Sequence, residues 1–169
     1  MEFIEIPLYI FLKIIMIHCS ISRFLDKIYF LMGIVDEFKK FNAELKNPNW
    51  SVSSISSNNE LIVSLWGHKP LLFKHPIERK QIYRDRIDRW SGNGCNELRK
   101  NLDLAFTEKL KIRPIISMLN NSSDFQHILD GKDGSKYSKK FNAKKDWIGE
   151  LIVWDGINFE IEFRLDDKS

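Results

Sequence analysis

Residues 147–163 read WIGELIVWDGINFEIEF, and this stretch carries the strongest indication of the fold. An Asp-Gly pair at 155–156 separates two apolar runs, and Asp-Gly favours the tight turn of a β-hairpin. In the second run every other residue is apolar, namely Ile157, Phe159, Ile161 and Phe163. A period of two is typical of a strand with one buried and one solvated face. The stretch therefore predicts an antiparallel hairpin near the C-terminus.

N-terminal to this hairpin, the sequence predicts helices and short strands. Apolar residues at helical spacing predict amphipathic helices over 33–46 and 96–110. Strands are predicted at 50–55, 60–66, 71–73 and 112–119, with a turn at Asn58-Asn59 between the first two. Pro114 indicates that the strand at 112–119 is an edge strand or carries a bulge. The polar residues 120–142 predict a loop. The expected fold is α+β, a mostly antiparallel curled sheet or partial barrel of five to six strands with two packed helices.

Composition indicates one globular domain, which we place at residues 32–169. The 169 residues are 43% hydrophobic and 29% charged, close to the globular average. Cys19 and Cys95 lie far apart and have no metal-ligand spacing, so neither a disulfide framework nor a zinc site is expected. A reducing cytoplasm is the simplest location.

Residues 1–31 differ from the rest, because 6–17 (IPLYIFLKIIMI) is almost wholly apolar. The run is shorter than the roughly 20 residues of a membrane-spanning helix, so stable membrane insertion is not expected. Glu2 and Glu5 stand where a signal peptide would carry Lys or Arg. The main interpretations are an apolar leader translated from an upstream start codon and foreign to the native protein, and a peripheral hydrophobic helix or partner-binding segment; a membrane anchor also stays open.

Motifs of common enzymes are missing from the sequence: there is no Walker loop, GxGxxG, HExxH or GxSxG. The four histidines lack metal-ligand spacing, and neither a catalytic residue nor a cofactor is predicted. A small metal-dependent nuclease stays open as an alternative, because Glu78-Arg-Lys80 has the Glu-x-Lys spacing that some such sites use.

Two basic clusters are the candidate nucleic-acid contacts. The first lies beside Trp90, which follows a run of arginines and precedes a Gly-rich bend, so its ring is a candidate for stacking on a base. The second lies in the polar loop, where mobile lysines suit phosphate contact. The predicted binding residues are Arg79, Arg84, Arg86 and Arg89 with Trp90 in the first basic cluster, and Lys136, Lys139, Lys140, Lys144 and Lys145 in the second basic cluster.

Residues 41–51 read FNAELKNPNWS and precede a strand that ends Leu65-Trp66. They resemble the N-terminal F-x-A-x-L-x-N-P-x-W-S phrase of a group of small uncharacterised bacterial and phage proteins. Residues 141–142, 149–151 and 155–156 are similar to that group's C-terminal hairpin. The resemblance begins at Met32, leaves out residues 1–31 and lapses between 71 and 113. Members occur near restriction and other defence genes, so the resemblance implies a DNA context without implying catalytic residues.

The basic clusters predict a non-catalytic nucleic-acid-binding or accessory protein. The resemblance implies a link to restriction or phage defence and favours DNA as the ligand, while the choice between DNA and RNA stays open. A metal-dependent nuclease and a protein-interaction module are the alternatives. The net charge of +3 permits nucleic-acid contact without requiring it.

Overall fold

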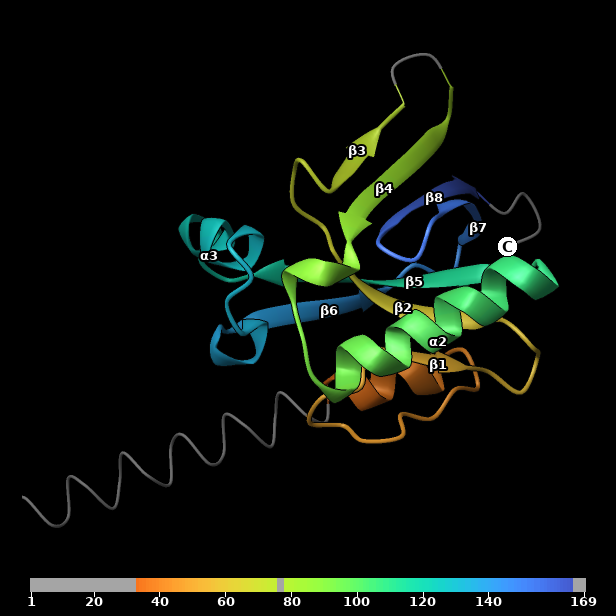
Figure 1. Cartoon of the computed structure of the whole chain (residues 1–169), viewed down its shortest axis with the longest axis horizontal. Coiled ribbons are helices and arrows are strands. Elements are labelled where there is room, and N and C mark those ends of the chain that lie inside the picture. The colour runs from red at the N-terminus through yellow and green to blue at the C-terminus, as the bar shows by residue number, and fades with distance from the viewer. Residues whose placement is uncertain (1–32, 76–77, 166–169) are drawn as a thin grey trace, which may run out of the picture.

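The computed structural model describes residues 33–75 and 78–165, and every strand within these ranges belongs to one sheet (Figure 1). The strands run in the spatial order β1-β2-β5-β7-β8-β4-β3, and β6 also pairs with β5. Pairing is antiparallel throughout except between β2 and β5. Their bounds are β1 Ser53–Ile55, β2 Leu61–Trp66, β3 Leu72–Lys74, β4 Lys80–Arg86, β5 Ile112–Leu119, β6 Lys139–Ala143, β7 Trp147–Trp154 and β8 Asn158–Leu165. The α+β class with a mostly antiparallel sheet is confirmed, but the predicted strand number is too low, since this unclosed sheet has eight strands.

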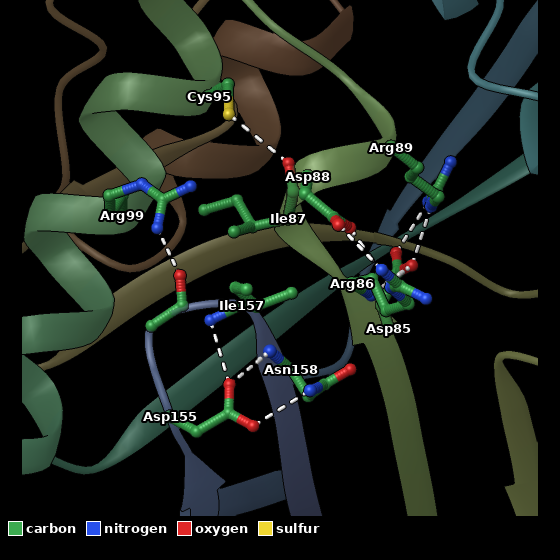
Figure 2. Close-up of polar contacts among 11 residues, drawn as sticks. Asp85, Arg86, Ile87, Asp88, Arg89, Cys95, Arg99, Asp155, Ile157 and Asn158 are labelled. Atoms are coloured by element: carbon green, nitrogen blue, oxygen red, sulfur yellow. Dashed lines mark hydrogen bonds and ion pairs between the residues drawn. The ribbon is translucent and has the colours of Figure 1, made fainter.

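The C-terminal hairpin forms as predicted, with β7 antiparallel to β8. Phe159, Ile161 and Phe163 are buried, as the alternating pattern predicts, whereas Ile157 precedes β8 at the turn and is exposed. At the turn, Gly156 takes a φ of +91°, a backbone region that glycine adopts readily. The Asp155 carboxylate accepts hydrogen bonds from the backbone N–H groups of Ile157 and Asn158, which holds the turn closed (Figure 2).

Helices and loops cover the sheet. The helices are α2 (Asn93–Glu108) and α3 (Phe125–Leu129), with helical residues at 33–39 and single 3₁₀ turns η1 (Ile87–Arg89), η2 (Ser122–Asp124) and η3 (Gly134–Lys136). The first predicted helix is shorter than expected, since it ends near Lys39. The predicted apolar leader, residues 1–31, lies outside the described residues. Within the described residues, every helix is too short or too polar to cross a bilayer.

Apolar side chains pack on both faces of the sheet, and β2 shows why. Leu61 and Val63 belong to the cluster beneath α2, whereas Ile62 belongs to a second cluster with Phe38 and Ile115. Successive residues of a strand point to opposite faces, so a strand buried on both sides needs an unbroken apolar run. The sequence of β2, LIVSLW, meets that requirement apart from Ser64.

Pro114 does not mark an edge strand, because β5 lies inside the sheet and pairs with β2, β6 and β7. The carbonyl of Pro114 accepts a hydrogen bond from the backbone N–H of Lys144, so its ring nitrogen faces the same edge of β5. On that edge β7 pairs only at Ile112 and β6 begins to pair at Ile115. The proline therefore occupies the seam between two partner strands, where a missing N–H breaks no ladder bond.

The predicted loop at 120–142 is also wrong in part. This stretch contains η2, α3 and η3, and its last residues form β6. Figure 1 shows α3 projecting beyond the end of β5, next to the start of β6. The lysines predicted as contacts in this part of the chain are therefore spread over η3, β6 and the turn that follows β6.

Candidate functional site

A cavity of about 340 Å³ lies where the parallel strands β2 and β5 end. The volume is within the range of about 300–1,000 Å³ that holds small ligands, and the carboxyl ends of parallel strands are a common ligand position. Its walls include six aromatic side chains from separate parts of the chain, and several polar groups also line it. The aromatic residues are Trp50, Trp66, Tyr83, Trp90, Phe141 and Phe159, and the polar ones include Ser64, Ser117, Asp85, Arg89, Lys132 and Lys139.

Two glycines let the cavity walls approach one another. At Gly134 an added Cβ would lie 2.8 Å from the indole ring of Trp66. At Gly94, in the first turn of α2, a Cβ would collide with the backbone carbonyl of Trp50. Close contact between η3 and β2, and between α2 and the segment before β1, thus requires glycine at both positions.

An ion pair with a buried carboxylate forms one side of the cavity. Arg89 binds Asp85 through two hydrogen bonds of 2.6 and 2.5 Å, and the side chains are 17% and 3% exposed (Figure 2). Asp85 also accepts from the Tyr83 hydroxyl at 2.8 Å and from the backbone N–H of Arg86 at 2.7 Å. Arg89 further donates to the carbonyl of Ile128 at 2.7 Å. The pair therefore ties β4 to α3.

Burial and the nearby Asp85 charge raise the pKa of Tyr83 well above its ordinary value, so its hydroxyl stays protonated and donates to Asp85. Burial acts to lower the pKa of Arg89, but the hydrogen bonds and charge of Asp85 outweigh it and the pKa is raised. Arg89, predicted as a nucleic-acid contact, is thus held in an internal pair.

Lys139 is the cation that faces the aromatic part of the cavity. Its Nζ lies 5.4 Å from the ring centroid of Trp66 and 6.0 Å from that of Phe141, and it donates to the carbonyl of Gly134 at 2.6 Å. Burial lowers the pKa of Lys139 to about 8, against an opposing effect of the Asp133 carboxylate. The ammonium group is therefore less well solvated than that of a surface lysine.

Two further groups could contact a ligand. The hydroxyls of Ser64 and Ser117 are 2.8 Å apart. The indole N–H of Trp90 is buried and has no hydrogen-bond partner among the described residues. A buried donor without an acceptor loses about 1–3 kcal/mol of solvation, so an acceptor brought by a ligand would be favoured there.

Of the predicted contacts, the structure brings Arg89, Trp90 and Lys139 to the cavity. Lys136 is exposed in η3, directly after the lining residues Gly134 and Ser135. Lys140 is exposed on β6, where alternation directs it to the face opposite Lys139. Lys144 and Lys145 lie past the other end of β6, and the Lys144 Nζ is 5.9 Å from the Trp147 ring.

The remaining arginines lie away from the cavity walls. Arg84 pairs with Glu160 across the β4–β8 ladder, and Arg86 pairs with Asp88 at 2.6 Å. Arg79 lines a separate groove of about 260 Å³, together with Lys74, Lys80, Arg164 and the apolar residues Trp147, Phe163 and Leu165. In that groove Lys80 and Arg164 both pair with Glu162. Acidic partners therefore offset much of the first basic cluster.

The nuclease alternative depends on Glu78, whose carboxylate is exposed and pairs with Lys80. Within residues 33–75 and 78–165, no group of three or more His, Cys, Asp or Glu side chains is placed to hold a metal ion.

Ser64, Ser117 and Trp66 were not identified as site residues from the sequence. Ser64 interrupts the otherwise apolar strand β2, and Ser117 follows three apolar residues of β5; a serine within an apolar run is the signal that could have indicated them. Comparison of the chain with protein-family models, curated proteins and solved structures found no match.

Proposed function

We propose that this protein is a nucleic-acid-binding module that receives an unpaired nucleotide in the cavity at the ends of β2 and β5. The observation that supports this most is that Lys139 and Trp90, which come from separate basic stretches, line the same cavity. A cation and an aromatic ring at one site match the two components of a nucleotide, a phosphate and a flat base.

The aromatic walls favour an unpaired base over a base in a duplex. Trp50, Trp66 and Trp90 are half-buried around the cavity, so a base must leave a stack to reach them. Stacking on an aromatic side chain contributes about 1–3 kcal/mol per base and tolerates different bases. We therefore expect single strands to bind in preference to blunt duplex, with weak sequence preference.

Lysines at the cavity supply the charge. Lys132 and Lys139 line it, Lys136 follows within one turn, and Asp133 is the acid among them. Three phosphate contacts on a single strand give a log–log salt slope of about −2.1, or roughly a 20-fold loss of affinity between 50 and 200 mM salt.

A binding assay with paired charge removals tests the proposal. Fluorescence anisotropy would compare a labelled single-stranded DNA, the RNA of the same sequence and the blunt DNA duplex over that salt range. Lys132→Gln/Lys136→Gln should reduce the slope to about −0.7, since one contact of three remains. The matched control is Lys109→Gln/Lys111→Gln, which removes two exposed lysines, one at the C-terminal end of α2 and one just before β5. Lys111 is about 20 Å of extended chain from Ser117 at ~3.3 Å per residue.

Binding that ignores salt, or an equal loss in both double variants, would contradict the proposal. A stronger affinity for DNA than for RNA would fit the DNA context that the sequence resemblance implies. The link to restriction or phage defence rests on that resemblance and enters the proposal only as a cellular context.

A further inference from the structure

Several of the groups that line the cavity are hydrogen-bond donors. Lys139 carries an ammonium group, and the Trp90 N–H has no acceptor among the described residues. Ser64 and Ser117 hold two hydroxyl protons between them, and their mutual hydrogen bond uses one. A ligand with several acceptor oxygens on one atom would satisfy such a set.

The Asp85 carboxylate on the cavity wall repels a bound anion less than an unpaired carboxylate would. Asp85 accepts four hydrogen bonds, two from Arg89 and one each from Tyr83 and the backbone of Arg86. Its charge is also matched by the Arg89 guanidinium. The other acid of the lining, Asp133, is exposed and accepts from the backbone N–H of Ser135 at 2.9 Å.

Lys139 gains more from an anion than a surface lysine does. Its ammonium group lies between the rings of Trp66 and Phe141, where it is poorly hydrated. An oxyanion placed beside it would restore the lost solvation through charge-assisted hydrogen bonds, which are about twice as strong as neutral ones.

We propose that the cavity binds the phosphate monoester of a nucleotide, with the phosphate at Lys139 and the base against the tryptophan rings. The ligand is either the phosphorylated end of a nucleic-acid strand, in which case the inference rests on the proposed function, or a free nucleoside monophosphate. A phosphate monoester offers three terminal oxygens and close to two negative charges at pH 7, whereas an internal phosphodiester offers two such oxygens and one charge, so the monoester satisfies more of the donors at Lys139.

The protonation of Lys139 makes the interaction depend on pH. The other charged groups of the lining are Lys132 and Asp133, before η3, and the Asp85–Arg89 pair of β4 and η1. Burial places the pKa of Lys139 at about 8, so about nine-tenths of the amines are protonated at pH 7 and about one-tenth at pH 9. The phosphate, with its second pKa near 6, stays dianionic over most of this window. Affinity for the phosphate should therefore fall up to about tenfold from pH 7 to 9.

The test uses the full chain and a 12-nucleotide DNA strand that carries a 5′-phosphate, a 3′-phosphate or hydroxyls at both ends. A phosphorylated strand should bind roughly tenfold more tightly than the hydroxyl strand at pH 7, and the difference should vanish at pH 9. Lys139→Met should abolish the difference. The matched control is Lys140→Met, which removes the neighbouring exposed cation of β6 and should preserve the difference.

Trp90→Phe provides a second variant, since it keeps a smaller aromatic ring in the wall and removes the N–H. It should reduce the phosphate preference in a protein whose thermal unfolding is unchanged. Equal binding of all strands would overturn the inference and leave the proposed function standing. A protein that binds adenosine 5′-monophosphate but none of the strands would support the inference and overturn the proposed function. A protein that binds neither adenosine 5′-monophosphate nor any strand would overturn both.

Discussion

Replacement of Arg89 by methionine should lower the free energy of unfolding by about 3–5 kcal/mol, because it leaves the Asp85 carboxylate buried with its countercharge removed. Asp85 is 3% exposed and would keep only the donors from Tyr83 and the backbone of Arg86. The Ile128 carbonyl of α3 would lose its donor as well. Domains of this size are stable by about 5–15 kcal/mol, so the loss is a large part of the total.

Urea unfolding followed by tryptophan fluorescence measures this loss. With a slope of about 2 kcal/mol/M, the midpoint should fall by roughly 1.5–2.5 M. Arg86→Met is the matched control, since Arg86 also pairs with a neighbouring aspartate but is exposed at the surface. Its midpoint should stay at the wild-type value, because surface pairs contribute little.

A double-mutant cycle with Asp85→Asn isolates the interaction between the two side chains. The double variant Asp85→Asn/Arg89→Met removes both charges, so it should be more stable than the sum of the single losses predicts, by about 1.5–3 kcal/mol. Losses that add within about 0.5 kcal/mol would show that the two residues do not act as a pair, and the account of how β4 is tied to α3 would then fail.

Gly134→Ala should destabilise the protein by about 1–3 kcal/mol and shift the tryptophan emission, since the added Cβ would lie 2.8 Å from the Trp66 ring; the thermal midpoint of the exposed neighbour Ser135→Ala should match the wild type. His68, stacked on Phe125 with centroids 4.4 Å apart, has a pKa lowered by burial, so the folded state holds it neutral while the unfolded state takes a proton below about pH 6.5. The contribution of neutral His68 to the free energy of unfolding is therefore complete above that pH and is lost as the pH falls towards the folded-state pKa. His68→Phe should show a smaller loss of urea midpoint between pH 7.5 and 5.0 than the wild type.

The elements that could be predicted from sequence are those whose local pattern and tertiary environment agree. In the C-terminal hairpin, the period of two and the Asp-Gly turn both belong to the residues that form it. In α2, Leu98, Leu102 and Ala105 are buried at helical spacing. In these segments the residues that are apolar in the sequence are the ones that are buried in the fold, so the spacing of apolar residues is enough to predict the element.

Strand β4 could not be predicted, because its core-facing positions include Asp85. A carboxylate at an inward position reads as a surface residue in the sequence, and the hydrogen bonds that make its burial tolerable come from Arg89 after the strand has ended. Strand β6, KKFNA, was also missed, because its sequence is polar and its partner β5 comes from a distant part of the chain. Lys139 becomes partly buried through its contacts with Trp66 and Gly134, which its own segment does not reveal. Composition cannot distinguish Lys139 from Lys140.

The same contacts decide which basic residues can carry a nucleic-acid function. Arg84, Arg86 and Arg89 each face a carboxylate, so they join strands and turns and add little net field at the surface. The lysines at the cavity face one exposed acid, Asp133. The lysines that line the cavity are therefore the basic residues that the fold places beside the aromatic rings that a base would need.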